Sequence, residues 1–298
     1  MATKEQRKKP YVIILLIFLL GAILAFAFMA MEFKDFNFRP KIAVIPIYGE
    51  IGASDSANPT EIIKFLDKAE KDSSVKAIIL DINSPGGTVV ASKQIADAVK
   101  SVKKPTVALI RDVGASGAFW IATAAKKIVA DPMSITGSIG VSASYLSFEK
   151  LMEKYGITYN RLVTGEYKDI GSPYKELSPK EKEMLQQKIN FVKEQFVSEI
   201  AQNRNLSRDF VENLSNGNIW LGIEAKKYGL VDVLGGENEA KKIAEALANI
   251  TNASLIRYEH EKSLTELLTG SESSFAYWFG KGFGSEFLKI QQALNIKS

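Results

Sequence analysis

Short apolar runs alternate with amphipathic stretches along residues 41–112, and this alternation restricts the possible fold more than any other feature of the chain. Residues 41–51 and 105–112 have the composition of strands. Residues 75–83 (VKAIILDIN) form a continuous apolar run, typical of a strand that is buried on both faces of a sheet. The two stretches between these strands carry apolar side chains at helical spacing. The order strand, helix, strand, helix, strand predicts an α/β fold with a parallel sheet and right-handed crossovers.

The chain after residue 112 predicts further elements of both kinds. The longest helix is expected over residues 179–204, because Ser178 is a suitable N-cap and Glu181 completes a capping box. The remaining expected elements are strands at 127–131 and 157–163, helices at 147–155 and 237–249, and a helical hairpin within 216–236. Loops that follow the parallel strands would lie at one edge of the sheet, where open α/β sheets bind their ligands.

Residues 11–31 (YVIILLIFLLGAILAFAFMAM) contain no charge and no proline, and they are long enough to cross about 30 Å of hydrocarbon. A cleaved signal peptide would have an apolar region of only about 7–15 residues. Residues 1–10 are basic, and nothing comparably basic follows the apolar run directly. The run is therefore predicted to be an uncleaved signal anchor, with the N-terminus in the cytoplasm and residues 41–298 on the other side of the membrane.

The composition excludes several classes of function. The net charge of +4 arises largely within residues 1–10, so the rest of the chain is close to neutral and no nucleic-acid partner is expected. Because the chain has no cysteine, it has no disulfide, no thiolate nucleophile and no thiolate metal ligand. The single histidine, His260, and the lack of clustered carboxylates provide no ligand set for a metal, and no cofactor is expected.

Two glycine-containing loops follow buried strands. In DVGASGAFW (112–120), Ser116 is flanked by Gly and Ala residues, which leave its hydroxyl open to approach and let the backbone turn sharply. In NSPGG (83–87), Gly87 can present its backbone N–H outward, and the N–H of Gly117 is a natural second donor. Two such donors form an oxyanion hole, in which each is worth about 2.7–4 kcal/mol of transition-state stabilisation. By itself, Pro-Gly-Gly is more often a plain turn.

A serine nucleophile needs a base, and His260 lies far downstream in a charged stretch. A lysine serves this role only when it is neutral, and burial lowers the pKa of catalytic lysines to about 7–8. Lys168, in the polar loop GEYKDIGSP (165–173), is one candidate among many lysines, and composition alone does not select it. The neighbouring Asp169 is expected to point away from Lys168, because a carboxylate facing the amine would oppose base catalysis.

Four motifs, NSPGG, GASG, TGSIGV and YKDIGSP, in this order and at these intervals, resemble those of the signal peptide peptidase A family over roughly residues 41–250. The resemblance implies the Clp protease/crotonase fold of repeated βαβ units and a serine protease with a serine–lysine dyad. It implies that Ser116 is the nucleophile, that Lys168 is the general base and that Ser138 orients the lysine amine. Gly87 and Gly117 match the oxyanion-hole donors. One departure is DVGAS before the nucleophile, which affects the pocket wall and not the dyad.

The resemblance also implies how the whole chain is organised. The expected divisions are a cytoplasmic N-terminus at 1–10, a transmembrane anchor at 11–31, a linker at 32–40, a catalytic protease domain at 41–258 and a C-terminal tail of open role at 259–298. Short members of the family assemble to complete their sites, so a homo-oligomer such as an octamer is expected. The expected partners are the cell membrane and peptide substrates, which include residual signal peptides and other exported or membrane-derived peptides.

Two other functions remain open at this point. An acyl-CoA hydratase or isomerase on the same fold would use the oxyanion hole with carboxylate acid–base groups in the cytoplasm, and the predicted export argues against it. A catalytically silent membrane scaffold would keep the fold without the chemistry. The presence of Ser116, Lys168 and Ser138 favours a protease over both.

Overall fold

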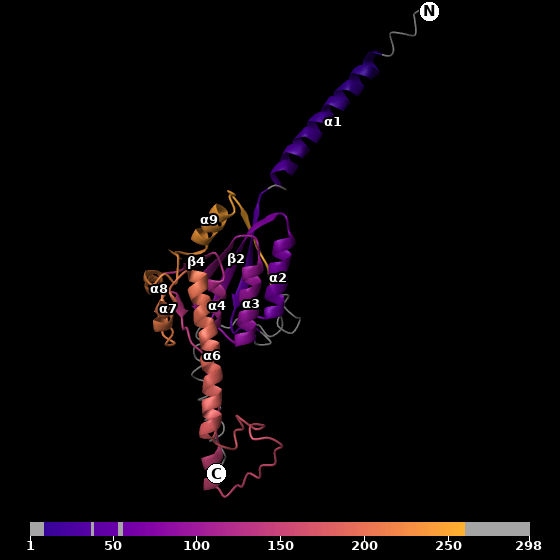
Figure 1. The fold of residues 1–298 in the computed structure, drawn as a ribbon. Coiled ribbons are helices and arrows are strands. Elements are labelled where there is room, and N and C mark those ends of the chain that lie inside the picture. The colour runs from indigo at the N-terminus through magenta and orange to yellow at the C-terminus, as the bar shows by residue number, and fades with distance from the viewer. Residues whose placement is uncertain (1–8, 37–38, 53–55, 260–298) are drawn as a thin grey trace, which may run out of the picture.

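The computed structural model describes residues 9–36, 39–52 and 56–259, and its centre is an eight-stranded sheet (Figure 1). The strands are β1 (Lys41–Tyr48), β2 (Val75–Ser84), β3 (Thr106–Ala115), β4 (Lys127–Ala130), β5 (Ile135–Gly137), β6 (Ile219–Leu221), β7 (Val233–Leu234) and β8 (Ser254–Arg257). The main order is β6-β5-β3-β2-β1-β8, and β4 pairs with both β3 and β7. Every pairing is parallel except that of β5 with β6, which confirms the α/β class predicted from the sequence.

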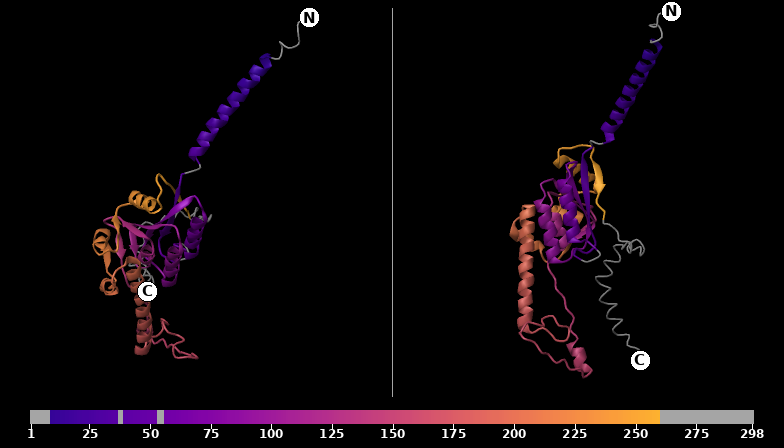
Figure 2. Two further views of the ribbon diagram at one scale, coloured as in Figure 1. Left: turned by 45° about the horizontal axis from the view of Figure 1, so that its top comes forward. Right: turned by 90° about the vertical axis from the view of Figure 1, so that its right-hand side faces the viewer.

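Helices cover both faces of this sheet (Figures 1 and 2). The helices are α1 (Lys9–Phe36), α2 (Pro59–Lys71), α3 (Val89–Ser101), α4 (Gly117–Thr123), α5 (Glu149–Lys154), α6 (Pro179–Arg204), α7 (Arg208–Leu214), α8 (Gly222–Lys227) and α9 (Glu237–Leu247). Ile45 and Ile47 of β1 pack in one buried cluster with residues of α2, α3, α4 and α6. Ile42 and Val44 of the same strand point the other way and pack with α9. Because successive strand residues face opposite sides, the apolar runs of the sequence fill two cores.

Two expected elements are wrong. Residues 157–163 form no strand; they are largely exposed and have no neighbouring strand whose backbone would complete the hydrogen-bond ladder. The helical hairpin expected within 216–236 is instead a strand, a helix and a strand. β6 pairs with β5 and β7 pairs with β4, so pairing with the sheet prevails over local helical preference. The helix expected over 179–204 is confirmed as α6, with the Ser178–Glu181 capping box.

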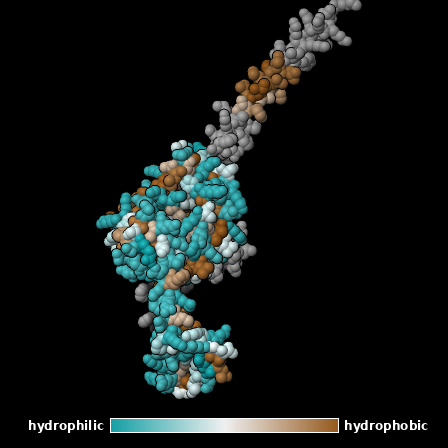
Figure 3. Space-filling model, in the orientation of Figure 1, coloured by the Kyte–Doolittle hydropathy of each residue, from teal (hydrophilic) through white to brown (hydrophobic). Residues whose placement is uncertain are grey.

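Helix α1 extends away from one end of the domain and includes the predicted anchor at residues 11–31 (Figures 1 and 3). Its described side chains, at residues 14–28, are exposed and almost all apolar. Within the part of the chain that the structure describes, no helix combines the length and apolar character that a membrane crossing requires.

An arm formed by residues 143–185 projects from the opposite end of the domain (Figures 1 and 2). It consists of α5, the irregular chain around it and the first turns of α6. The second half of α6 is anchored in the core through Phe196, Val197 and Ile200. The arm itself exposes large apolar side chains, including Leu162, which is 97% exposed. The apolar side chains of α6 that are buried in this chain therefore all lie in its C-terminal half.

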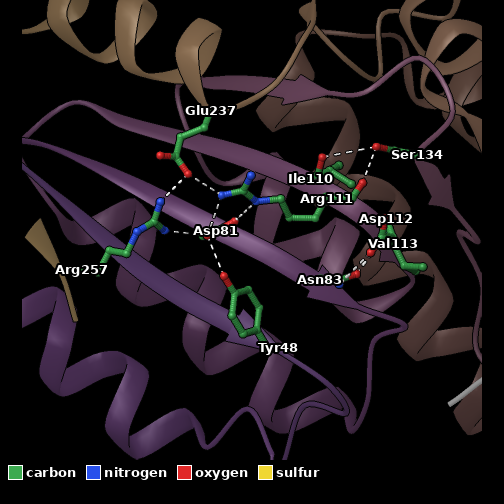
Figure 4. A network of polar contacts seen from close by, with 10 residues as sticks. All are labelled: Tyr48, Asp81, Asn83, Ile110, Arg111, Asp112, Val113, Ser134, Glu237 and Arg257. Carbon is green, nitrogen blue, oxygen red and sulfur yellow. Dashed lines mark hydrogen bonds and ion pairs between the residues drawn. The ribbon is translucent and has the colours of Figure 1, made fainter. Parts of the chain in front are cut away.

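A buried carboxylate, that of Asp81 on β2, links four strands on the face of the sheet that α9 covers (Figure 4). It accepts hydrogen bonds from the hydroxyl of Tyr48 on β1 (2.6 Å) and from Nε of Arg111 on β3 (2.5 Å). Arg257 on β8 approaches it within 3.3 Å, and Arg111 also contacts Glu237 at the start of α9 (2.7 Å). Burial and the hydrogen bond to Asp81 raise the pKa of Tyr48, and the hydrogen bond to Asp81 raises the pKa of Arg111.

Replacement of Arg111 by Ala is expected to lower the free energy of unfolding by about 3 kcal/mol, because the buried carboxylate of Asp81 loses its principal counter-charge. Lys71→Ala is the control. Lys71 pairs with Asp67 at 2.6 Å on the exposed surface, and its removal should cost less than about 1 kcal/mol. Equilibrium urea denaturation of the two variants makes the comparison, and equal losses would contradict the assigned role of Asp81.

Candidate active site

Ser116 lies at the tight turn between a strand and a helix. Strand β3 ends at Ala115 and α4 begins at Gly117, so Ser116 is the only residue between them. Its φ of 53° and ψ of −123° are unfavourable for a residue with a side chain, and such strain concentrates at functional sites. The N–H of Ser116 donates to the carbonyl of Gly137 at 2.8 Å, which helps to hold the turn. A turn of this kind presents its side chain at the edge of the sheet.

Ser138 reaches the same place because β5 pairs with β3. Ala115 is the register partner of Gly137, so Ser116 and Ser138 each follow one member of the same pair. Ser138 also has a positive φ, of 50°, and its N–H donates to the carbonyl of Asn218 at 2.8 Å. Both serines line one cavity, although 21 residues of chain separate them.

The predicted oxyanion-hole glycines lie next to each other. A Cβ on Gly87 would come within 2.0 Å of the carbonyl oxygen of Ile51, so only glycine fits there. A Cβ on Gly117 would lie 3.4 Å from the backbone nitrogen of Gly87, which places the two N–H groups close together. The first N–H groups of a helix have no intrahelical partner, so that of Gly117 remains available at the start of α4.

Asn83 connects the two loops, and the sequence analysis did not single it out (Figure 4). Its Oδ1 accepts from the N–H of Val113 at 3.1 Å, and its Nδ2 donates to Asp112 at 3.1 Å. This occurs where the register of β2 against β3 shifts between Ile82 and Ser84. One amide side chain thus spans from the glycine loop to the strand that carries the serine. The only sequence signal was its place in NSPGG.

The cavity has a volume of about 510 Å³, and its lining mixes polar and apolar side chains. Beneath it, the nearly buried rings of Trp120 and Phe196 stack with their centroids 4.6 Å apart. Its other described lining residues are Gly87, Val89, Ser92, Ser116, Gly117, Ser138, Gly140, Val141, Ser142, Gln186, Ile189, Asn190, Lys193, Ser215, Asn216 and Gly217. Four of the five predicted site residues therefore meet at this cavity. Among the described residues, no three His, Asp or Glu side chains are grouped so that they would hold a metal.

Lys168 is the predicted site residue that does not reach the cavity. It is exposed in the arm, and its N–H donates to the carbonyl of Gly165 at 3.2 Å. Asp169 beside it contacts Arg161 (2.5 Å) and Lys175 (3.3 Å), so its carboxylate is directed to other cations, as expected. The hydrogen bond from Arg161 is the main cause that lowers the pKa of Asp169 to about 2. This guanidinium also closes the loop that presents Lys168, because it donates to the carbonyl of Glu166.

A different lysine, Lys193, lines the cavity and was missed in the sequence analysis. Its Nζ lies 2.5 Å from Oε1 of Glu212, so this amine is already engaged by a carboxylate. Glu212 lies 19 residues further along, on α7, so only the packing of α6 against α7 shows this contact. The candidate base within one chain is thus already held by a carboxylate, whereas Lys168 stands apart.

Comparisons with known proteins give the family. Residues 98–251 match the family model described as Peptidase family S49, and residues 41–145 match that of the NfeD1b N-terminal domain. A protein from Methanocaldococcus jannaschii, provisionally named a protease, is 38% identical over 93% of this chain and 94% of its own. A protein from Enterococcus faecium, provisionally named signal peptide peptidase SppA, is 31% identical over 80% of this chain and 70% of its own.

A solved structure titled as a mutant of a membrane-bound stomatin-specific protease resembles the fold. It matches with a TM-score of 0.50 at 18% identity, and the match covers 75% of this chain and 99% of that one. This likeness supports the Clp-protease-like α/β architecture. The family match and the extended identity to named peptidases lead to one assignment. The chain belongs to peptidase family S49 and, within it, to the signal peptide peptidase A family.

Proposed function

We propose that the protein is a membrane-anchored serine endopeptidase in which Ser116 is the nucleophile and Lys168, from the arm of a neighbouring subunit, is the general base. The observation that carries the proposal is the division of the site. The cavity joins Ser116 and Ser138 to the two N–H donors, whereas Lys168 is exposed on a projecting arm. A second copy of the chain is a natural source of the missing group, since each copy has both the cavity and the arm.

The proposed chemistry uses these groups in sequence. The neutral amine of Lys168 takes the proton of Ser116 Oγ as that oxygen attacks the scissile carbonyl carbon. The N–H groups of Gly87 and Gly117 bind the oxyanion that forms. The protonated amine then gives its proton to the leaving nitrogen, and a water molecule hydrolyses the acyl-enzyme by the same route. Ser138 is placed to accept a hydrogen bond from the amine and to orient it.

Exposed apolar side chains on the arm support assembly. Tyr155 and Ile157 are 69% and 59% exposed, and Leu162 is almost fully exposed. A patch of this kind marks a contact surface in soluble domains. We infer that the arm packs on another subunit in a closed homo-oligomer, of which an octamer is one form. In that arrangement, water is excluded around Lys168, which favours the neutral amine.

The substrate class follows from the cavity wall and from the anchor. Val89, Val141 and Ile189 add accessible apolar side chains to the cavity that holds Ser116, and residual signal peptides are apolar. We propose such peptides, and other exported or membrane-derived peptides, as substrates. The uncharged run at residues 11–31 supports an anchor in the cell membrane. The basic N-terminus supports a cytoplasmic start and an extracytoplasmic catalytic domain.

Ser116→Ala is expected to abolish cleavage of an unfolded peptide, and Lys168→Ala should do nearly the same. The double variant should be little worse than either, because residues that act as one unit are strongly non-additive. Ser138→Ala should lose about 10–100-fold, as expected for a group that positions the base. Values of kcat/KM measured across pH should rise with pH, since only the neutral amine acts. A rate maximum near pH 5 would contradict this mechanism.

Lys193→Gln discriminates between the two candidate bases. If the ion pair with Glu212 is structural, this variant keeps measurable cleavage with the same rise in rate as pH increases. If Lys193→Gln is inactive while Lys168→Ala cleaves at the wild-type rate, the base lies in the same subunit as the serine. That result would overturn the shared site.

Mixing two inactive variants tests the shared site directly. Ser116→Ala and Lys168→Ala chains, unfolded together and reassembled in equal amounts, should regain activity. In a ring in which each site takes its serine and its lysine from different subunits, about a quarter of the sites are then complete. Each variant reassembled by itself is the control. If the mixture stays inactive although it forms mixed oligomers, Ser116 and Lys168 act within one chain.

Labelling of intact cells tests the topology. Because the chain has no cysteine, a single introduced cysteine reports one position. Asn213→Cys, on the exposed side of α7, should react with a membrane-impermeant thiol reagent in intact cells. A cysteine placed at Thr3, before the apolar run, should react only after lysis. The reverse pattern would show that the orientation is wrong.

A further inference from the structure

The two edges of the sheet at which its strands start and end have different neighbours. The parallel register aligns the first residues of β1, β2, β3 and β4 at one edge, because Lys41 pairs with Val75, Ile78 with Thr106 and Val107 with Lys127. The Ser116 cavity lies beyond the last residues of these strands, at the other edge. Helix α1 leaves the domain at the first edge, and the arm leaves at the second (Figures 1 and 2).

The first edge is rich in lysine and arginine. Side chains that have no ion pair among the described contacts lie along it, and we call them the basic edge: Arg39, Lys41, Lys76, Lys103 and Lys126. All but the partly buried Lys41 are exposed. They come from the approaches to four adjacent strands and so form a row across the sheet.

The carboxylates of Glu70 and Asp72 lie beside this row: both attract Lys104, and Asp72 also attracts Lys41. Lys71 and Lys127 hold the exposed Asp67 and the half-buried Asp232, respectively. The carboxylate of Asp72 accepts from the N–H and the hydroxyl of Ser74. The amine of Lys104 donates to the carbonyls of Ala69 and Asp72. Burial lowers the pKa of Lys104, the nearby charges of Glu70 and Asp72 raise it, and the charge of Lys76 lowers it, so two carboxylates accompany the cations at this edge.

The edge is also tied closely to the end of α1. From Phe36 to Lys41 the chain spans at most about 18 Å when fully extended. Anionic membranes attract lysines only within about a Debye length of their surface, which is about 8 Å at physiological ionic strength. A domain held this close to a bilayer can bring a row of lysines into that range, provided that it turns this edge toward the lipid.

We propose that the basic edge is a docking surface for the headgroups of anionic phospholipids, and that it holds the catalytic domain with its Ser116 cavity facing away from the bilayer. This inference rests on the proposed membrane anchor and adds the orientation of the domain and the lipid class it prefers. The short chain between Phe36 and Lys41 keeps the domain near the bilayer. The positive side chains of the basic edge can then contact the phosphate groups of the lipids. A nucleic acid has similar charge, and the experiment separates it from lipid.

The experiment uses the full chain in nanodiscs of phosphatidylcholine, with or without about one third phosphatidylglycerol. A nitroxide at Ser101→Cys, on the exposed end of α3 beside Lys103, reports collisions with a nickel-chelating lipid. Leu162→Cys on the arm is the distant label. We expect contact at residue 101 in the anionic discs, little contact there in the neutral discs or at high salt, and none at residue 162.

Charge variants then test the residues. Lys76→Gln, Lys103→Gln and Lys126→Gln combined should lower the ratio of docked to undocked domains by on the order of 100-fold. The matched control combines Lys154→Gln and Lys182→Gln on the arm with Lys188→Gln on α6 just beyond it, all exposed lysines without ion pairs among the described contacts. It has the same change in net charge and should keep the contact. Equal contact in neutral and anionic discs, or equal loss in both triple variants, would overturn the proposal. So would binding of an oligonucleotide by the basic edge without lipid contact.

The two proposals fail in different ways. If the wild-type chain does not enter neutral nanodiscs, the anchor is wrong. Sedimentation with phosphatidylglycerol vesicles then tests the basic edge by comparing the two triple variants, and equal sedimentation would overturn it. Cleavage of a soluble peptide in detergent tests the dyad separately. The basic-edge variant should cleave that peptide as the wild type does, since these lysines lie at the edge remote from Ser116.

Discussion

The carboxylate of Asp81 is the contact on which the arrangement of the catalytic edge depends. It is fully buried, and side chains from three other strands converge on it, while Arg111 extends the network to the start of α9. The loops that follow these strands carry Ile51, Gly87 and Ser116. A buried charge needs its partners in place, so the network disfavours any sliding of one strand against the next. A slip between β2 and β3 would separate Gly87 from Gly117, and Asn83 opposes the same slip closer to the site.

Residue patterns in the sequence correctly predicted those strands and helices whose apolar side chains are buried by other parts of the same chain. The apolar run of β2 and the capped start of α6 required no knowledge of distant contacts. Ser116, Ser138, Gly87 and Gly117 meet because their motifs end parallel strands or follow paired ones. Asn83 and Lys193 were missed because their partners are distant in sequence, and no local pattern encodes such a pairing. The strand expected at residues 157–163 failed for a related reason. An apolar run reports that a surface is covered, but it does not report whether the cover is a neighbouring strand or another molecule.

The net charge of the chain also did not predict how its charged residues are distributed in space. The summed charge of the chain beyond its first residues is close to zero, and on that basis no nucleic-acid partner was expected. The parallel topology sorts the charges, however, because residues that precede strands gather at one edge and residues that follow them gather at the other. The lysines at or just before the starts of β2, β3 and β4 are far apart in sequence and lie along one edge of the sheet. A net charge near zero therefore does not exclude a local row of like charges, because the fold can gather the residues at the starts of the strands along one edge.

Under the proposed anchoring and docking, the length of the central strands would also limit which peptide bonds can reach Ser116. Strand β2 has 10 residues and rises about 33 Å between the edge that adjoins α1 and the edge that holds Ser116. In a chain anchored by residues 11–31 and seated on its basic edge, the nucleophile stands about that far above the lipid. A polypeptide still embedded in the bilayer must extend roughly ten residues beyond the headgroups before a bond reaches Ser116. The height of the sheet would thus set a minimum substrate length. Short segments and loops outside the membrane would not reach Ser116, whereas long unfolded segments and peptides released from the membrane would.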